Sequence, residues 1–327
     1  MKAIIPVAGI GSRLRPHTYF LPKVLLNVAG KPILQHILDS LIAAGVDNLV
    51  IVTGHLGDEV EKFVRANYSV QVEFVSQAEP LGLGHAIWCS SEFFNDEPLL
   101  IVLGDTIFDT DLSRIVEFDF SALGVKKVQN PERFGVVVTD ANGFITNLVE
   151  KPEKFVSDLA IVGIYYIKNS FLLRESLDEL LKKQIRTKGE FQLTDALQLM
   201  ISKGEKFKTF PVEGWYDCGK PETLLETNRF LLKKNSYYRN FDGSVIIPPV
   251  YISDSAIIEH SVIGPYATVA SGAIVKDSVV RDSIISDEAR VESYLLEKSI
   301  IGNNAIVKGT FYKINVGNSS EINYVSI

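Results

Sequence analysis

Glycines and basic side chains directly follow the first apolar run of the chain. Residues 2–8 (KAIIPVA) are typical of a buried parallel strand, and Gly9-Ile10-Gly11-Ser12-Arg13 comes next. A glycine-rich turn at the carboxyl end of such a strand lets backbone N–H groups approach an anion closely. The first 38 residues also hold five basic side chains and no acidic one, namely Lys2, Arg13, Arg15, Lys23 and Lys31. This end of the chain is therefore predicted to meet phosphate.

Two better-known glycine loops do not fit this segment. A dinucleotide-binding turn needs a third glycine or alanine where this chain has Leu14, and an acidic residue about twenty positions on, where none precedes Asp39. A P-loop needs Gly-Lys-Ser/Thr, and Gly30-Lys31-Pro32 breaks that pattern. Taken alone, the glycines could equally form a tight turn beside a solvated Arg13.

Two aspartates, far apart in the chain, are candidates for a metal site. Asp105 follows Gly104 at the end of the apolar run 98–103, so it should project from the same sheet edge as the glycine turn. Mg²⁺ is usually held by one or two carboxylates together with phosphate oxygens and waters. Asp217, within Trp-Tyr-Asp-Cys-Gly, is the candidate second ligand. Either aspartate on its own could instead be a turn or cap residue.

The elements that must position these residues alternate along the first part of the chain. Apolar runs at 48–53, 70–75 and 98–103 alternate with segments of helical spacing, which predicts a parallel sheet with covering helices. From about 133 the pattern changes to paired strands, with Asn142-Gly143 as a hairpin turn signal. Further helices are predicted at 170–183, 192–202 and 221–234.

The sequence pattern changes near residue 240, and the new pattern continues to the C-terminus. Aliphatic residues recur every five or six positions, and a small residue precedes most of them: Ile258, Ile263, Val269, Val275, Val280, Ile285, Val291, Leu296, Ile301 and Val307. This spacing predicts a solenoid of short strands, each with one branched side chain pointing inward. An ordinary β-sandwich is the alternative, but its strands would alternate with period two. We therefore expect two domains, 1–240 and 241–327.

The composition limits the class of protein. The chain has 327 residues, of which 46% are hydrophobic, and a formal charge of −7, which argues against nucleic acid or a membrane surface as its main partner. Two cysteines, Cys89 and Cys218, give neither a disulfide framework nor a zinc motif. With no signal peptide or bilayer-spanning stretch recognisable, we expect a cytoplasmic enzyme.

Seven motifs, in order, resemble those of the sugar-1-phosphate nucleotidyltransferases over residues 1 to about 235. They are the glycine loop with Arg13 and Lys23, the segments Leu-Gly-Leu-Gly-His-Ala (81–86), Gly-Asp (104–105), Phe-Gly-Val (134–136) and Glu-Lys-Pro (150–152), then Gly-Glu-Phe-Gln-Leu-Thr-Asp (189–195) and Trp-Tyr-Asp-Cys-Gly (215–219). The most similar branches are the long-form glucose-1-phosphate thymidylyltransferases and the uridylyltransferases. The resemblance implies an α/β fold, with a mostly parallel Rossmann-like sheet, covering helices and a C-terminal left-handed parallel β-helix.

The resemblance also implies a reaction and roles for individual residues. A nucleoside triphosphate and a sugar 1-phosphate would give a nucleotide sugar and pyrophosphate, with Mg²⁺ as cofactor. By this resemblance Gly9, Gly11, Ser12 and Arg13 would hold the triphosphate, and Lys23 would neutralise the α-phosphate. Gln77 and Gly82 would read the base, and Asp105 and Asp217 would share the metal. On the sugar side, Gly135 would allow close approach, Glu150 would accept hydroxyl hydrogen bonds, Lys151 would grip the phosphate and Glu190 would support the pocket.

Departures from the family pattern leave the substrate open. Ser12 replaces the commoner threonine, and Val-Leu-Leu-Asn (24–27) replaces a pattern that ends in proline. The segment 81–86 resembles uridylyltransferases, whereas the glycine loop and the tail resemble thymidylyltransferases, so dTTP and UTP both remain candidates. Two other functions are a catalytically silent subunit, and a bifunctional enzyme with acetyl transfer in the β-helix, for which His260 is the available base. A homo-oligomer is expected.

Overall fold

The protein is described here by a computed structural model, and the description is limited to residues 1–317 and 319–321. The chain divides into two compact units, Met1–Leu231 and Leu232–Ile327. Helix α6 (Pro221–Lys234) runs across this division. The boundary expected at residue 240 lies further on, between α6 and strand β14 (Val245–Ile246). Each unit is described by itself below.

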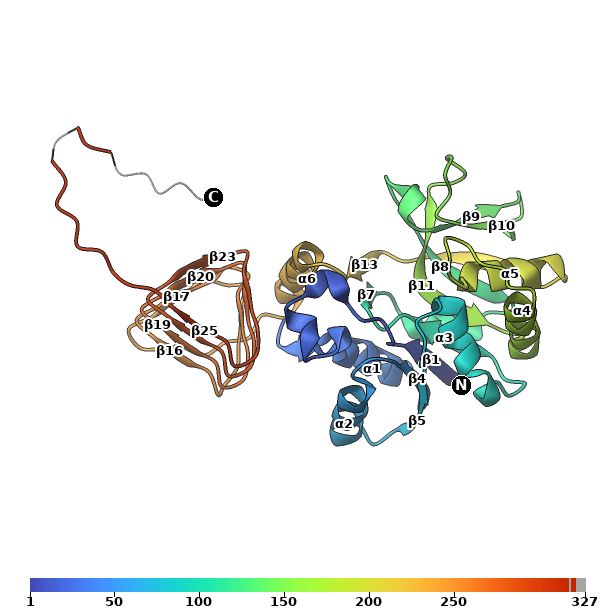
Figure 1. Cartoon of the computed structure of the whole chain (residues 1–327), viewed down its shortest axis with the longest axis horizontal. Helices are drawn as coiled ribbons and strands as arrows, with labels where there is room; N and C mark the ends of the chain where they lie inside the picture. Colours follow the sequence, from blue (N-terminus) through green and yellow to red (C-terminus); the bar gives the residue numbers. More distant parts are fainter. Residues whose placement is uncertain (318, 322–327) are drawn as a thin grey trace. The chain divides into compact units, whose positions relative to one another are not determined.

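The first unit is built on a nine-stranded sheet that contains the predicted parallel strands (Figure 1). Strands β5 (Gln71–Ser76), β4 (Asn48–Thr53), β1 (Lys2–Pro6) and β6 (Leu99–Val102) lie side by side in that order, and all run parallel. Strands β1, β4 and β6 are rich in Ile, Val and Leu, and most of their side chains are buried, as expected of strands covered on both faces. Edge strand β5 has no fully buried side chain. The carboxyl ends of the four parallel strands therefore share one edge of the sheet.

Strand β11 (Leu159–Ile167) extends the sheet past the end of β6. Its second half pairs antiparallel with β6, and β8 (Ser121–Lys127) pairs antiparallel with both halves. In the first half, Ala160 also pairs with Val136 in the hairpin of β9 (Gly135–Thr139) and β10 (Ile145–Glu150). The predicted turn closes this hairpin, because the Gly143 N–H donates to the Asp140 carbonyl at 3.1 Å. The hairpin consequently lies beyond the carboxyl end of β6. Strand β12 (Phe207–Pro211) completes the sheet beside β8, and β7 (Thr106–Asp109) and β13 (Gly214–Asp217) form a separate ribbon.

Helices cover the sheet and bury their apolar stripes against it. The predicted helices are found as α4 (Ser170–Lys182), α5 (Leu193–Ser202) and α6. Helices α4 and α5, together with α3 (Leu83–Cys89), pack in one core with strands β1, β4, β6 and β11. The remaining elements of this unit are α1 (Ile33–Ala43), α2 (Gly57–Asn67), β2 (Asn27–Val28), β3 (Lys31–Pro32) and the 3₁₀ turns Ser12–Leu14, His17–Tyr19, Lys23–Leu25, Ser91–Phe93, Leu112–Glu117 and Pro131–Arg133. Among the described residues, no helix has the length and apolar character needed to cross a membrane.

The second unit is a left-handed parallel β-helix whose coils carry the predicted repeat (Figure 1). Three four-stranded parallel sheets form its sides, in the orders β14-β17-β20-β23, β15-β18-β21-β24 and β16-β19-β22-β25. The predicted inward aliphatics from Ile258 to Leu296 are at most 8% exposed, while Ile301 and Val307 pack at the edge of the same core. After β14, these strands are β15 (Tyr251–Ile252), β16 (Ile257–Glu259), β17 (Val262–Ile263), β18 (Thr268–Val269), β19 (Ile274–Lys276), β20 (Val279–Arg281), β21 (Ile284–Ile285), β22 (Arg290–Glu292), β23 (Leu295–Glu297), β24 (Ile300–Ile301) and β25 (Ile306–Lys308).

The corners of the β-helix explain why a small residue precedes most inward aliphatics. Residues with positive φ recur one coil apart, for example His260, Asp277 and Ser293. A small residue packs into the corner directly after the first two, whereas Ser293 is followed by Tyr294, which is exposed. Ser261 and Ser278 are two such corner residues, and both are buried. A side chain that points into the corner after a left-handed residue has room only if it is small, whereas one that points to solvent, such as Tyr294, can be large. His260 is therefore accounted for as a corner residue, and its side chain is 73% exposed.

Candidate active site

A cavity of about 480 Å³ opens at the carboxyl edge of the parallel strands. Loops that follow three strands line it: the glycine loop after β1, Gln77 after β5 and Asp105 after β6. Nine of the thirteen predicted site residues line this cavity, namely Gly9, Gly11, Ser12, Arg13, Lys23, Gln77, Gly82, Asp105 and Glu190. The other four, Gly135, Glu150, Lys151 and Asp217, lie outside its wall and are described below.

The glycine loop takes a conformation that glycine adopts without strain. Gly11 has φ +68°, in the left-handed region, and its carbonyl accepts hydrogen bonds from Leu14 N–H at 2.9 Å and Thr18 Oγ1 at 2.8 Å. A Cβ at Gly11 would also meet the Lys23 side chain at 2.9 Å. The loop is thus packed against Lys23, and Ser12 and Arg13 follow in a 3₁₀ turn at the cavity wall.

Asp105 and Lys23 form the central ion pair of the cavity. Lys23 Nζ donates to Asp105 Oδ2 at 2.7 Å, and the lysine side chain is only 8% exposed. Desolvation in the cleft works to raise the pKa of the Asp105 carboxyl, but the Lys23 ammonium, its hydrogen bond and one from Thr106 outweigh it, so the pKa lies below the usual value. The backbone at Gly104 passes so close to the end of β1 that a Cβ there would collide with the Val7 side chain. This close approach, which only glycine allows, holds Asp105 beside the glycine loop.

Asp217 reaches the same edge through the β7–β13 ribbon. Asp217 is the register partner of Thr106, and the N–H of the next residue, Cys218, donates to the Asp105 carbonyl at 3.1 Å. The Asp217 carboxylate accepts from Gly219 N–H at 2.9 Å and from Thr223 Oγ1 at 3.3 Å. The two aspartates are therefore neighbours across the ribbon although 112 positions (217 − 105) separate them in the chain.

Arg13 lies on the Asp217 side of the cavity. Its Nη2 atom would be 3.0 Å from a Cβ placed on Gly219, and Asp217 Oδ1 would be 2.8 Å from the same point. The guanidinium and the carboxylate thus flank one glycine of the cavity wall. This places positive charge where the glycine loop and the metal candidate meet.

The donor set of this region fits a magnesium ion. Mg²⁺ takes oxygen ligands and usually keeps waters and phosphate oxygens beside one or two carboxylates. Asp105 is ionised beside Lys23, and Asp217 presents a second carboxylate that already accepts two hydrogen bonds. No larger His, Cys, Asp or Glu cluster occurs among the described residues, so an ion held here would depend on substrate oxygens for its remaining ligands.

At the opposite end of the cavity, Gln77 is held by α3 and the loop before it. Gln77 is 7% exposed, and its Nε2 atom lies 3.1 Å from the Gly82 carbonyl and 3.0 Å from His85 Nδ1. Gly82 is fixed in turn by the loop that carries Glu190, since a Cβ on Gly82 would meet the Phe191 carbonyl at 2.6 Å. Gln77, Gly82 and Glu190 therefore form one packed group, so Glu190, predicted on the sugar side, lies beside the two residues predicted to read the base.

Three of the four predicted sugar-side residues, Gly135, Glu150 and Lys151, form a second cluster at the base of the hairpin. Glu150 Oε2 accepts from Thr194 Oγ1 at 2.7 Å, and Glu150 is the register partner of Gly135. Lys151 has φ +44°, a strained value for a lysine, and its Nζ lies 3.7 Å from Glu150 Oε1. Burial raises the pKa of Tyr165, with further contributions from Glu150 and Asp105, so this tyrosine lies near both carboxylates.

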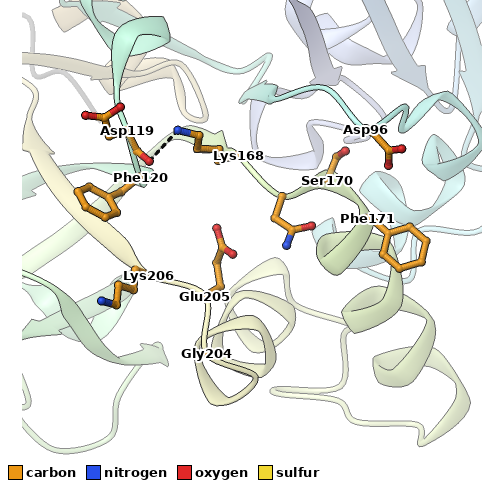
Figure 2. A pocket seen from close by; sticks show the side chains of 10 residues that line it. Asp96, Asp119, Phe120, Lys168, Ser170, Phe171, Gly204, Glu205 and Lys206 are labelled. Carbon is orange, nitrogen blue, oxygen red and sulfur yellow. Dashed lines mark hydrogen bonds between the residues drawn. The ribbon is translucent and has the colours of Figure 1, made fainter.

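A second cavity, of about 540 Å³, lies at the opposite edge of the sheet (Figure 2). Figure 2 shows Glu205 at its centre between Lys168 and Lys206, with Phe120 at one side. Ser121 Oγ donates to Glu205 at 2.7 Å, and Lys168 Nζ donates to the Asp119 carbonyl at 2.8 Å. These polar groups are engaged with one another, and none of the thirteen predicted site residues lines this cavity. The chemistry predicted from the sequence lies at the other cavity.

Two residues that touch the predicted site received no role from the sequence. His85 contacts Gln77, and Thr194 donates to Glu150. His85 belongs to the motif at 81–86 and Thr194 to the motif at 189–195, so the sequence indicated that these segments are near the site. It did not indicate which side chains they contact. The partners follow from packing of α3 and α5 against the sheet, which local sequence does not reveal.

Comparison with known proteins agrees with this geometry. Residues 2–234 match the model of the nucleotidyl transferase family. The low-salt glycan biosynthesis nucleotidyltransferase Agl11 of Haloferax volcanii is 31% identical, with 93% of each chain covered. The bifunctional protein GlmU of Methanocaldococcus jannaschii is 36% identical over 96% of this chain and 74% of its own. A structure of UDP-glucose pyrophosphorylase with UDP-glucose superposes with a TM-score of 0.62 at 26% identity, covering 72% of this chain and 99% of that one.

Proposed function

The chain belongs to the nucleotidyl transferase family, and from this premise we propose that it transfers a nucleotidyl group from dTTP or UTP to glucose 1-phosphate. The observation that carries the proposal is the meeting of the glycine loop, Arg13, the Lys23–Asp105 pair and Asp217 at one sheet edge. Such a site offers positive charge and backbone donors to phosphates, with two carboxylates available to a metal ion.

The reaction needs no covalent nucleophile from the protein. An oxygen of the sugar phosphate forms a bond to the α-phosphorus, the bond from that phosphorus to the bridging oxygen breaks, and pyrophosphate leaves. Catalysis of this kind depends on positioning and on neutralising charge. Lys23 would face the α-phosphate, and Arg13 with the glycine loop would hold the departing pyrophosphate. Mg²⁺, when bound by Asp105 and Asp217, would neutralise phosphate charge.

The sugar phosphate would be bound at the hairpin cluster. Glu150 is fixed by Thr194 at Oε2, and its carboxylate oxygens have further lone pairs that can accept sugar hydroxyl hydrogen bonds. Lys151, beside Oε1, offers an ammonium for the phosphate. The strained backbone of Lys151 supports a functional role, because a costly conformation persists only where its surroundings maintain it. The other functions considered above gain no comparable support. The charged residues of the site are present and paired, and His260 is explained as a corner residue.

A pyrophosphate-release screen tests the proposal. Five nucleoside triphosphates are crossed with glucose, N-acetylglucosamine, mannose and galactose 1-phosphates, with and without Mg²⁺. We expect dTTP or UTP with glucose 1-phosphate to give the highest kcat/KM, and turnover to require the metal. A mismatched hydrogen bond at a buried polar site costs about 1–3 kcal/mol, which corresponds to roughly ten- to hundredfold selectivity. A preference for ATP or GTP would show that the base specificity is assigned wrongly.

A further inference from the structure

The orientation of the Gln77 side-chain amide is fixed by its neighbours. The Gly82 carbonyl can only accept a hydrogen bond, so the Gln77 atom 3.1 Å from it must be the NH₂ nitrogen, Nε2. The same nitrogen lies 3.0 Å from His85 Nδ1. With one N–H committed to Gly82, the second can be used only if Nδ1 accepts, which requires a neutral imidazole that carries its proton on Nε2.

This arrangement leaves the amide oxygen of Gln77 for a ligand. Within the part of the chain that the structure describes, Oε1 has no hydrogen-bond partner, and Gln77 lines the cavity. Oε1 is also not fully buried, because the described side-chain atoms that are fully buried without a partner are Ser176 Oγ and Asp195 Oδ2. The group offered at this end of the cavity is therefore a hydrogen-bond acceptor. Uracil and thymine carry an N3–H that can donate to it. N3 of cytosine bears only a lone pair, and the donor nearest to it is the N4 amino group, which lies outside the ring.

The surroundings of His85 keep its ring neutral and in place. The ring stacks on Trp88, with centroids 5.8 Å apart, and Cys89 Sγ lies 3.9 Å from Nε2. Desolvation lowers the pKa of His85, and the Arg186 charge lowers it further, while the charge of Glu79 and a hydrogen bond with its backbone act in the opposite direction. The net shift is downward, so the ring is neutral near pH 7 and can accept from Gln77.

We propose that His85 is a positioning residue that fixes the Gln77 amide with its oxygen toward the nucleotide, so that the site selects uracil or thymine over cytosine. This inference rests on the proposed function, because it assumes that a pyrimidine nucleotide binds at this end of the cavity. If His85 were protonated, its Nδ1–H would face an N–H of Gln77, and two donors cannot form a hydrogen bond. Rotating the Gln77 amide by half a turn would bring Oε1 against the Gly82 carbonyl, where two acceptors would face each other. In both cases the Gln77 side chain is held less firmly.

Two variants of His85 separate the acceptor from the ring. His85→Phe keeps an aromatic ring beside Trp88 but removes the acceptor. His85→Asn loses the ring but can place an oxygen, Oδ1, at the position of Nδ1, because both atoms are bonded to Cγ. Isothermal titration of UTP, dTTP and CTP, with Mg²⁺, is compared among the wild-type protein and both variants. Binding is the main readout, so the result does not depend on which sugar is used.

We expect the wild-type protein to bind UTP and dTTP roughly ten- to hundredfold more tightly than CTP. In His85→Phe this ratio should fall to within about threefold, mainly through weaker UTP binding, with kcat little changed. His85→Asn should retain most of the ratio. In the wild-type protein the ratio of UTP to CTP affinity should fall as the pH drops below about 6.5, the ordinary histidine pKa, because the pKa of His85 lies lower still. In His85→Asn the ratio should not change with pH over this range.

Three outcomes decide between the two proposals. If His85→Phe retains the wild-type selectivity while remaining folded, the positioning role is wrong, whatever the enzyme turns over. If the selectivity behaves as expected but no sugar phosphate yields pyrophosphate, the proposed reaction fails and the role of His85 stands. If the wild-type protein binds no pyrimidine nucleotide, both proposals are overturned.

Discussion

At the scale of single residues, the Lys23–Asp105 pair is the feature on which the chemistry depends most directly. The lysine is almost fully buried, so its charge is compensated mainly by this carboxylate. Because the pKa of Asp105 in the folded protein lies below its ordinary value, the pair stabilises the fold above the usual carboxyl range. That contribution should be lost as the pH falls through the lowered pKa.

We predict that Asp105→Asn and Asp217→Asn each abolish Mg²⁺-dependent turnover, with a loss of at least about a hundredfold in kcat. Each change removes one negative charge from the predicted metal site while keeping the side-chain shape. Pyrophosphate release over a Mg²⁺ series, with thermal unfolding measured in parallel, gives the readout. Asp47→Asn, at an exposed loop position, is the matched control and should retain full activity.

The two variants should differ in stability. Asp105→Asn removes the partner of a buried ammonium, whereas at Asp217 an amide oxygen can still accept from Gly219. We expect the larger drop in unfolding temperature for Asp105→Asn, with both variants still folded. Activity within about threefold of wild type in either variant, at saturating Mg²⁺, would contradict the two-carboxylate site.

At the scale of elements, the corners of the β-helix show how short-range sequence controls a long structure. Ser278 Oγ donates to the Lys276 carbonyl at 2.6 Å and accepts from the N–H of Tyr294, one coil further on, at 3.1 Å. Ser283 makes the same pair of contacts, to Arg281 and from Ser299. The corner serines thus supply hydrogen bonds between coils that the strands themselves cannot make.

Ser278→Ala should destabilise the β-helix by about 1–3 kcal/mol, because it leaves the N–H of Tyr294 without its partner. The Lys276 carbonyl still accepts from the Ser293 N–H. Ser299→Ala is the matched control. Ser299 donates in the same way, to Glu297, but it is less buried. Its loss should cost clearly less, as urea unfolding of the two variants would measure. Equal costs would mean that contacts between coils do not determine the stability of the corner.

At the scale of the whole molecule, the proposed catalytic residues all lie in the first unit, and the regular surfaces lie in the second. One side of the β-helix carries a register-matched aliphatic column of Val245, Val262, Val279 and Leu295, with Leu295 78% exposed. Another side carries the ion pairs Lys276–Glu259 and Lys308–Glu292. A flat aliphatic column is the better candidate for self-association, because charged ladders are well solvated.

Cutting the chain after residue 240 should therefore damage assembly and solubility more than chemistry. We expect smaller oligomers or aggregation on sedimentation, with pyrophosphate release retained in any soluble fraction. Leu295→Glu in the full chain is the companion variant, since it puts a charge on the aliphatic column without removing any coil. A truncated protein of unchanged oligomeric state but without activity would show that the β-helix contributes to the site.

Local patterns in the sequence were enough to predict the β-helix and the parallel sheet. The spacing of aliphatics in the second unit requires a β-helix, because only one inward side chain per short strand fits a period of five to six. Runs of Ile, Val and Leu alternating with amphipathic segments required a parallel sheet, and the glycine loop and Asp105 then had to meet at its carboxyl edge. The elements that were predicted correctly are those that a pattern of neighbouring residues specifies.

Tertiary structure alone decided which side chains meet across the chain. Glu150 is fixed by Thr194, Asp217 by Thr223 and Gln77 by His85, and in each case a helix brings the partner. These contacts depend on how α3, α5 and α6 pack and on the direction in which each side chain then points. No periodicity encodes that direction, because many packings bury the same apolar stripe. The polarity that Gln77 presents to the cavity could therefore be known only once its two hydrogen-bond partners were in place.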